Sequence, residues 1–247
     1  MAKLLERTEK VYTSIIRKYE MSGKSPEEYI LSLKGTESFR RLNYYVLKRY
    51  CEENGIEFTL DIKDLPKDTP DLSLVQEGLK KEDIIKMIHA VKKSNYQASK
   101  TFMALSTTYG TRCIELLRIT EKDIDLNRKL ILIKTAKSGE PRIHKIPDQI
   151  LPYLYGFQPV KNQLTLWQIF HKSFKLAGIN TNGYGYHDIR KCLFTELINN
   201  GARYEFAEYF LRWKLGGRVS FSHYFIPEVD RVAEEIFKYH PFIKEWE

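Results

Sequence analysis

The sequence has little cysteine, no long apolar run and no sign of a secretory leader. Three cysteines are scattered over 247 residues, at Cys51, Cys113 and Cys192. An odd and widely spaced set forms neither a disulfide framework nor a zinc cluster, so we expect a cytoplasmic protein without a metal site. The longest apolar stretches fall far short of the roughly 20 residues that a membrane span needs. The first ten residues carry acids instead of an apolar signal core, and we expect no contact with membranes.

Positive charge is present in excess and is unevenly distributed. Lysine and arginine total 40 against 32 acidic residues, which gives a net charge of +8 and favours a polyanionic partner. Residues 1–50 hold 11 basic and 6 acidic side chains, whereas residues 51–73 hold 2 and 7. The acidic stretch ends in a segment with two prolines, which argues against a continuous helix or strand. We therefore predict a domain at 1–65, a linker at 66–75 and a larger domain at 76–247.

Hydrophobic periodicity predicts a mainly helical chain with one hairpin. Apolar residues recur every three or four positions in ten segments, which we assign as helices: 3–20, 26–34, 37–53, 81–94, 97–109, 112–119, 164–177, 187–200, 203–213 and 228–239. Two β-rich runs, 130–134 and 142–146, flank Ser138 and Gly139, which is typical of a β-hairpin. The predicted fold class is mainly α with a small antiparallel sheet, in two lobes.

The predicted helix 37–53 combines basic and aromatic side chains. Its basic residues are Arg40, Arg41, Lys48 and Arg49, and its tyrosines are Tyr44, Tyr45 and Tyr50. Such a mixture suits contact with a phosphate backbone. The alternative is an ordinary amphipathic helix whose tyrosines are buried and whose charges are solvated.

A rigidly placed arginine is predicted at the junction of two helices. We expect Gly110 to end one helix, Thr111 to cap the next, and Arg112 to lie in its first turn at the rim of the core. A guanidinium held in this way can donate two hydrogen bonds to a phosphate. The alternative is a surface residue, or one that pairs with Glu115 three positions on.

Three further segments carry reactive side chains. Lys137 lies in the hairpin turn, with Lys134 as a rival, although exposed hairpin lysines are common. His187 and Arg190 are three residues apart at a helix start and would share a face, unless the histidine is structural. Tyr224 follows a basic, glycine-containing segment that would present its hydroxyl, although a single tyrosine among 16 is more often structural.

Taken in order, these motifs resemble the tyrosine recombinase (lambda-integrase) family. The resemblance covers residues 74–226: G-T-R-x-x-E-L-L around Arg112, the hairpin Lys137, the His187-x-x-Arg190 box and the late Tyr224. The ending G-R-x-S…H-Y, at 217–224, is most similar to archaeal virus and plasmid integrases. The amino-terminal helices stand where the family keeps its helical core-binding domain.

The resemblance implies a clamp around duplex DNA and a cut-and-rejoin reaction through a covalent 3′-phosphotyrosine. Tyr224 would be the nucleophile, and Arg112 and Arg190 would neutralise the phosphate oxygens. Lys137 would protonate the departing 5′-oxygen, and His187 would assist proton transfer at the tyrosine. No metal or other cofactor is expected.

One position departs from the family pattern. The family has a second histidine, or a tryptophan, between the His-x-x-Arg box and the tyrosine. Trp213 stands at about the right spacing and is our candidate catalytic residue there, although it can equally be a core residue at the end of helix 203–213. Lys214 and Arg218 are the alternatives, and we predict that both, with Lys134, contact DNA.

The resemblance also implies partners and leaves alternatives open. We expect double-stranded DNA with a specific recombination site, self-association into a tetramer on DNA, and a place in the nucleoid of the host cell. The helix 228–239 would be exchanged between protomers or packed on its own domain. The alternatives to an active recombinase are an inactive DNA-binding accessory protein of the same fold and a type IB-like topoisomerase.

Overall fold

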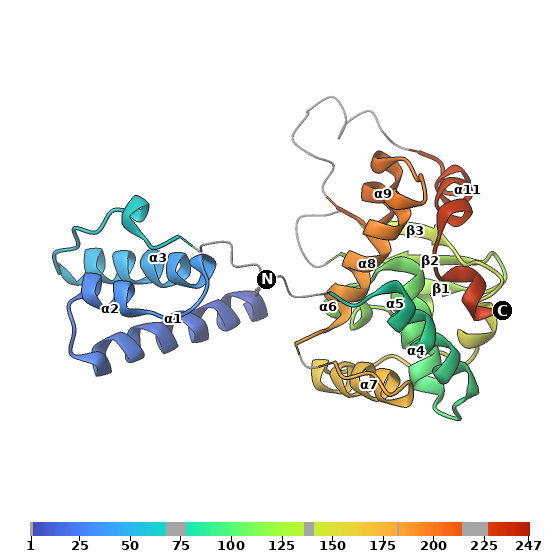
Figure 1. Cartoon of the computed structure of the whole chain (residues 1–247), viewed down its shortest axis with the longest axis horizontal. Coiled ribbons are helices and arrows are strands. Elements are labelled where there is room, and N and C mark those ends of the chain that lie inside the picture. Colours follow the sequence, from blue (N-terminus) through green and yellow to red (C-terminus); the bar gives the residue numbers. More distant parts are fainter. Residues whose placement is uncertain (1, 68–77, 136–140, 182, 214–226) are drawn as a thin grey trace. The chain divides into compact units, whose positions relative to one another are not determined.

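The computed structural model describes residues 2–67, 78–135, 141–181, 183–213 and 227–247. Contacts divide the chain into two compact units, residues 1–76 and 77–247, and each is considered by itself. The described residues are mainly helical, with one small antiparallel sheet, and so confirm the predicted fold class (Figure 1). None of the described helices is long and apolar enough to cross a membrane.

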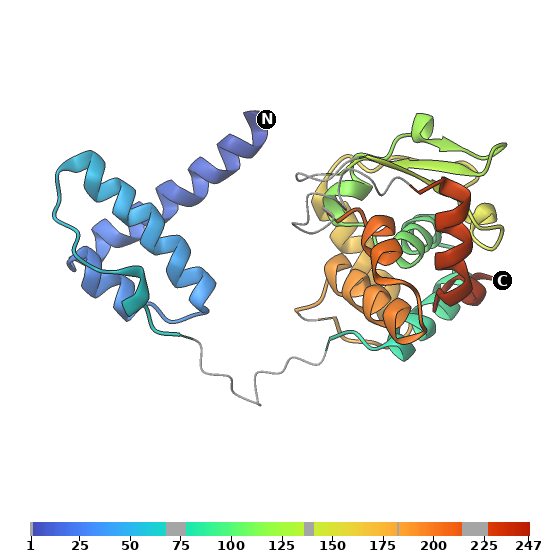
Figure 2. The same cartoon turned by 90° about the horizontal axis from the view of Figure 1, so that it is seen from above.

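Three helices form the first unit (Figure 2): α1 (Ala2–Ser22), α2 (Pro26–Ser32) and α3 (Glu37–Asn54), with a short 3₁₀ turn, η1 (Ile62–Asp64). Local sequence explains their ends. Ser25 caps α2 and shares a reciprocal capping box with Glu28, and Thr36 caps α3. Gly55, at φ 65°, ends α3 in the left-handed conformation. All three helices lie where the periodicity predicts them.

Seven helices and a sheet make up the described part of the second unit. The helices are α4 (Lys81–Lys93), α5 (Gln97–Tyr109), α6 (Cys113–Leu116), α7 (Gln163–Leu176), α8 (Tyr186–Asn199), α9 (Tyr204–Phe210) and α11 (Val229–Tyr239). The described part also contains three 3₁₀ turns: η3 (Glu121–Asp123), η4 (Leu151–Tyr153) and η5 (Ile243–Trp246). Helix α5 is buried along most of its length and contacts α4, α7 and α8, so its carboxyl end lies inside the unit.

The sheet contains β1 (Ile124–Asp125), β2 (Leu130–Ile133) and β3 (Arg142–Lys145), paired antiparallel in that order. Ile131 lies opposite His144, and Ile133 lies opposite Arg142. The predicted hairpin is therefore confirmed, whereas β1 was not predicted, because two residues give no alternation pattern. The turn, with Lys137, Ser138 and Gly139, lies outside the described residues.

Two predicted helices are too long. The segment 112–119 is helical only over α6, and the segment 203–213 ends at Phe210. Helix α9 stops there because Arg212 adopts a left-handed conformation, φ 58°, which cannot continue a right-handed helix. Trp213 therefore follows a backbone reversal and does not end a helix.

The carboxyl-terminal helix packs on its own unit. Helix α11 buries Val232, Ala233 and Ile236 against α9 and β3. Beyond it, the indole Nε1 of Trp246 donates a 3.0 Å hydrogen bond to Thr107 Oγ1 in the core. These contacts lie within one chain (Figure 1), and exchange of the helix between protomers stays a prediction.

Candidate active site

Gly110 lies where a larger residue would be strained and would displace its neighbours. It ends α5 at φ 54°, and its N–H donates to the Ser106 carbonyl at 2.9 Å. A Cβ there would lie 2.7 Å from a methyl of Leu211 and 3.2 Å from one of Leu193. The predicted helix end is confirmed. Thr111 is not the next cap, however, because it is buried and the N-cap residue of α6 is Arg112.

Arg112 sits at the rim of the core and is held by Glu115. Its side chain is 26% exposed, and its Nη1 donates to Glu115 Oε1 at 2.6 Å. The backbone N–H of Arg112 donates to the other carboxylate oxygen, Oε2, at 2.9 Å. Arg112 thus lies at the predicted rim and also forms the pair with Glu115 that was the alternative. The pair fixes the orientation of the guanidinium.

Arg190 approaches the same carboxylate from α8. Its side chain is 1% exposed, and its Nη1 donates to the Gly110 carbonyl at 2.7 Å and lies 3.9 Å from Glu115 Oε2. Its Nη2 donates to the Leu211 carbonyl. Its Nε has no hydrogen-bond partner among the described residues. The guanidinium therefore keeps hydrogen-bonding capacity that its protein contacts do not use.

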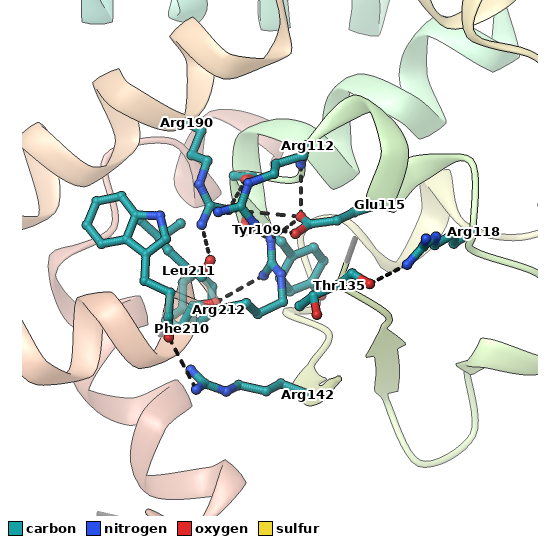
Figure 3. A network of polar contacts seen from close by, with 12 residues as sticks. Tyr109, Arg112, Glu115, Arg118, Thr135, Arg142, Arg190, Phe210, Leu211 and Arg212 are labelled. Atoms are coloured by element: carbon teal, nitrogen blue, oxygen red, sulfur yellow. Dashed lines mark hydrogen bonds and ion pairs between the residues drawn. The ribbon is translucent and has the colours of Figure 1, made fainter. Parts of the chain in front are cut away.

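A third arginine, Arg212, completes the cluster and was not predicted. Its side chain is fully buried, and its Nη2 donates to Glu115 Oε2 at 2.9 Å and to the Tyr109 carbonyl at 3.0 Å. Figure 3 shows the guanidinium groups of Arg112, Arg190 and Arg212 converging on Glu115. The one sequence signal was a basic residue among large apolar ones, in Phe-Leu-Arg-Trp at 210–213.

The cluster carries more positive than negative charge. Burial raises the pKa of the Glu115 carboxyl, but the charge of Arg212 and hydrogen bonds from Arg112 and Arg212 outweigh it and hold the pKa below its usual value. Burial, with the charges of Arg212 and Arg112, lowers the pKa of Arg190 to about 9. One buried carboxylate thus serves three arginines, and the excess charge favours binding of an anion such as a phosphate.

His187 lies on the surface at the start of α8, one turn before Arg190. Partial burial, together with the charge of Lys191, lowers the pKa of its imidazole, and the charges of Arg190 and Arg112 act in the same direction. The imidazole is therefore neutral at neutral pH and can accept a proton. The structure brings His187, Arg190 and Arg112 into one electrostatic neighbourhood, as the spacing predicts for the first two.

Trp213 borders the cluster. Its ring packs on Phe194, with centroids 4.4 Å apart, and the Arg190 guanidinium carbon lies 5.5 Å from the ring centroid. The backbone around it is fixed by Arg142, which donates to the Tyr209 carbonyl and stacks on the Tyr209 ring at 3.8 Å. The two other residues weighed for this position, Lys214 and Arg218, lie outside the described residues, as does Tyr224.

Lys134 follows β2 and is engaged with a buried acid. Its ammonium lies 2.7 Å from Asp123 Oδ1. Burial raises the pKa of Asp123, but hydrogen bonds from Lys134 and Thr120 outweigh it and keep the pKa below its usual value. Nearby, Arg118 donates to the Thr135 carbonyl, a contact that no sequence pattern indicates (Figure 3). The strand end before the hairpin turn is thus anchored by two cations.

The basic residues of α3 differ in their surroundings. Arg41, Lys48 and Arg49 are exposed, and two of them pair one turn away with acids, Arg41 with Glu37 and Arg49 with Glu53. Tyr45 is exposed beside them, whereas Tyr44 is buried.

Arg40 points the other way. It is 8% exposed, and its guanidinium donates to the Pro66 carbonyl at 2.8 and 3.1 Å and to the Gly35 carbonyl. The guanidinium thus has a structural role, because it ties α3 to the segment around Pro66, and its expected contact with DNA stays a prediction.

No cluster of three or more His, Cys, Asp or Glu suited to a metal ion occurs among the residues that the structure describes. The groups that converge at the site are arginines and one carboxylate. Arginine donates hydrogen bonds only, so the arrangement is built to hold an anion.

Known proteins resemble the chain in sequence and in fold. It is 24% identical to the tyrosine recombinase XerA of Pyrococcus horikoshii over 226 residues, which cover 79% of this chain and 75% of the relative. The XerA of Thermococcus kodakarensis is 22% identical, with 78% and 76% covered. An integrase from mycobacterium phage Brujita has a similar fold, with a TM-score of 0.57 at 14% identity and 98% and 92% covered.

A dimer of lambda integrase bound to a COC′ core site gives a TM-score of 0.51 at 14% identity, with 78% of this chain and 77% of that one covered. The model of the phage integrase family matches residues 77–224, which include the arginine cluster and end on Tyr224. The chain therefore belongs to the phage integrase family of tyrosine recombinases.

Proposed function

We propose that this site-specific recombinase cuts and rejoins DNA through a 3′-phosphotyrosine bond to Tyr224, with Arg112 and Arg190 as the phosphate-binding pair. The observation that supports it most is the convergence of these two arginines on one buried carboxylate. An arginine pair held in this way presents N–H donors to an incoming phosphate without rearrangement.

In the proposed reaction, the Tyr224 hydroxyl oxygen attacks the scissile phosphorus. A phosphorus–oxygen bond forms to the tyrosine as the bond to the 5′-oxygen breaks. The neutral imidazole of His187 assists removal of the tyrosine proton, and Lys137 gives a proton to the departing 5′-oxygen. Rejoining is the reverse, with a 5′-hydroxyl as the attacking group, so each step conserves the phosphodiester energy.

Arg112 and Arg190 stabilise the charge that builds on the non-bridging oxygens. A preorganised donor of this kind contributes about 3–4 kcal/mol to transition-state stabilisation. Trp213 completes the site in this proposal, with its indole beside the Arg190 guanidinium. Lys214 and Arg218 remain the alternatives for that role.

We propose that Arg41, Lys48 and Arg49 on α3, with Lys134, Lys214 and Arg218, contact the phosphate backbone. Exposed ion pairs such as Arg41–Glu37 are weak, about 0–1 kcal/mol, so phosphates can displace the acids. Arg40 is left out, because carbonyl groups already occupy its guanidinium. The DNA would carry a specific recombination site, recombination would use a tetramer, and the protein would act in the host nucleoid.

Trapping of the covalent intermediate tests the proposal. The substrate is a duplex with a nick beside the cleavage point, its sequence selected from a random library by binding to the protein. Incubation with EDTA should give a denaturant-resistant protein–DNA adduct that Tyr224→Phe abolishes. Tyr155→Phe, at an exposed tyrosine, is the matched control and should form the adduct normally.

The outcome also separates the alternatives. A wild-type protein that binds the selected DNA but never forms an adduct would be an inactive accessory protein. Adduct formation on unrelated sequences at equal rates would indicate a topoisomerase. Replacing Trp213, Lys214 and Arg218 singly by alanine identifies the residue that completes the site between Arg190 and Tyr224. Loss of that residue should slow cleavage by about tenfold or more.

A further inference from the structure

Arg212 has no role in the proposed chemistry, yet its side chain is as fully enclosed as that of Glu115, both at 0% exposure. Its guanidinium contacts four separate segments: the carbonyls of Tyr109 and Phe210, the Glu115 carboxylate and, at 3.4 Å, the His144 imidazole. Helices α5, α6 and α9 and strand β3 therefore meet at one side chain. The Nε of Arg212 is unpartnered among the described residues, so its contacts are made through the two terminal nitrogens.

Arg212 and Arg190 are linked three times. They donate to adjacent carbonyls at the end of α5, Tyr109 for Arg212 and Gly110 for Arg190. Arg190 also donates to the carbonyl of Leu211, the residue directly before Arg212. Both face the same oxygen of Glu115, at 2.9 Å for Arg212 and 3.9 Å for Arg190.

The link to Arg112 runs through the carboxylate. Glu115 Oε2 accepts from Arg212 and from the Arg112 backbone, and Oε1 accepts from the Arg112 side chain. A carboxylate gripped on one side by Arg212 has a fixed orientation on the other. The positions of both phosphate-binding arginines thus depend on Arg212.

The backbone conformation of Arg212 also indicates that its side chain has a function. Arg212 is one of two non-glycine residues with positive φ among those described, at 58°, a conformation that is unfavourable for an L-residue. Glycine would relieve that strain but would lose the guanidinium. The residue also stands 12 positions before Tyr224, at the start of the connection that carries the proposed nucleophile.

We propose that Arg212 is a positioning residue for recombination: through Glu115 and the Leu211 carbonyl it sets Arg112 and Arg190 in register for the scissile phosphate. It touches neither DNA nor the reacting atoms. The inference rests on the proposed function, since it concerns the step that those two arginines assist.

The experiment is a pH profile of single-turnover cleavage on the selected nicked duplex. Arg212→Met should cleave about 100-fold more slowly or worse, and Arg212→Lys, which restores the charge but not the guanidinium geometry, should regain about tenfold and stay slower than the wild type. The charged and titratable groups around the carboxylate are Arg112, Arg190 and Arg212, with Tyr109, Arg142 and His144 behind them. Without Arg212, burial should raise the pKa of the Glu115 carboxyl. The acidic limb of the rate–pH profile should therefore move to higher pH in Arg212→Met and return in Arg212→Lys.

Two controls keep the test decisive. Arg142→Met removes another buried arginine, which stands on β3 and donates to the Tyr209 and Trp213 carbonyls, and should leave the acidic limb in place. In a Glu115→Gln background, Arg212→Met should add little to the loss of rate, since the shared carboxylate is already gone. Cleavage and Tyr224 dependence of the wild type are measured alongside, so failure of the recombinase proposal itself is seen separately.

Three results would overturn the inference. They are an unchanged profile in Arg212→Met, an equal shift in Arg142→Met, or fully additive losses with Glu115→Gln. If Arg212→Met does not fold, Arg212→Lys decides between the outcomes: wild-type rates at every salt and pH would show that exact placement by the guanidinium is unimportant.

Discussion

Arg190 and Arg49 both lie on amphipathic helices, yet the Arg190 side chain is buried and the Arg49 side chain is exposed. The Arg190 side chain is 1% exposed and is held by two carbonyls and a nearby carboxylate, whereas that of Arg49 is 69% exposed and meets one acid a turn away. A fixed, desolvated guanidinium is suited to a transition state, because it acts without reorganisation. An exposed one is suited to binding, because it adapts to a phosphate at little cost.

The largest expected effect tests the fixed side of this comparison. Arg190→Ala removes a preorganised charge and two anchors at the site, and we expect single-turnover cleavage to fall about 1,000-fold, or about 4 kcal/mol in the barrier. The adduct assay measures it. Arg128→Ala, at an exposed arginine of the same unit, should cleave normally. A loss of less than tenfold for Arg190→Ala would contradict the assignment.

The two units should also respond differently to acid. All six histidines lie in residues 77–247, and burial lowers the pKa of His240 to about 4. Between pH 6.5 and 4, His240 binds a proton in the unfolded chain, where its pKa is near 6.5, but not in the folded unit. The free energy of unfolding therefore falls as the pH drops from 6.5 toward 4. His240 alone contributes a loss of about 2 kcal/mol by pH 5. His144, whose pKa burial holds well below its usual value, adds to it.

Hydrogen exchange of the full chain at pH 6.5 and pH 5, corrected for intrinsic rates, checks this difference. Protection of α5 should weaken while that of α3 holds. His240→Gln should flatten the dependence, even if it is less stable overall. Equal losses in both units would show that the buried histidines are not the cause.

Arg40 breaks a simple division between the units, because it is a buried arginine on the helix that we propose contacts DNA. Arg40→Ala leaves the Pro66 and Gly35 carbonyls without their donor, and we expect a loss of about 2 kcal/mol in the free energy of unfolding. Urea denaturation measures it. Arg41→Ala, its exposed neighbour, should change stability by less than about 0.5 kcal/mol. A near-neutral Arg40→Ala would mean that the buried contacts are replaced by water.

The smallest effect concerns the exposed cations. Lys48→Ala should weaken DNA binding by about 0.5–1 kcal/mol on specific and unrelated sequences alike, and lower the slope of log affinity against log salt by about 1. Fluorescence anisotropy at several salt concentrations measures both. A change in sequence preference, or a salt slope that does not move, would place Lys48 away from the phosphates.

What the sequence could predict was local. Gly110 ends α5 because left-handed backbone favours glycine, and the hairpin follows from two short β-rich runs around a turn; both signals lie within a few residues. The order of Arg112, the His187 box and Tyr224 along the chain predicted the family, and the match over 77–224 confirms it. The roles of individual residues stay predictions.

What the sequence could not predict depends on distant partners. Arg40 donates to the carbonyl of Pro66, 26 residues away, and Arg212 to the carboxylate of Glu115, 97 residues away. Thr111 looked like a cap because of its type, but the Glu115 carboxylate reaches back to the Arg112 N–H instead. Neither periodicity nor composition indicates such contacts, because residue type alone predicts that an arginine is exposed.

The ion pair between Glu115 and Arg212 also constrains how the sequence can drift over generations. A carboxylate enclosed at 0% exposure tolerates no vacancy among its donors, so loss of Arg212 alone strands a buried charge. A descendant that abandons the arginine must bring another donor to the same oxygen or abandon the acid as well. Positions 115 and 212 should therefore be inherited as a unit, and a substitution at either is tolerated only in the company of the other.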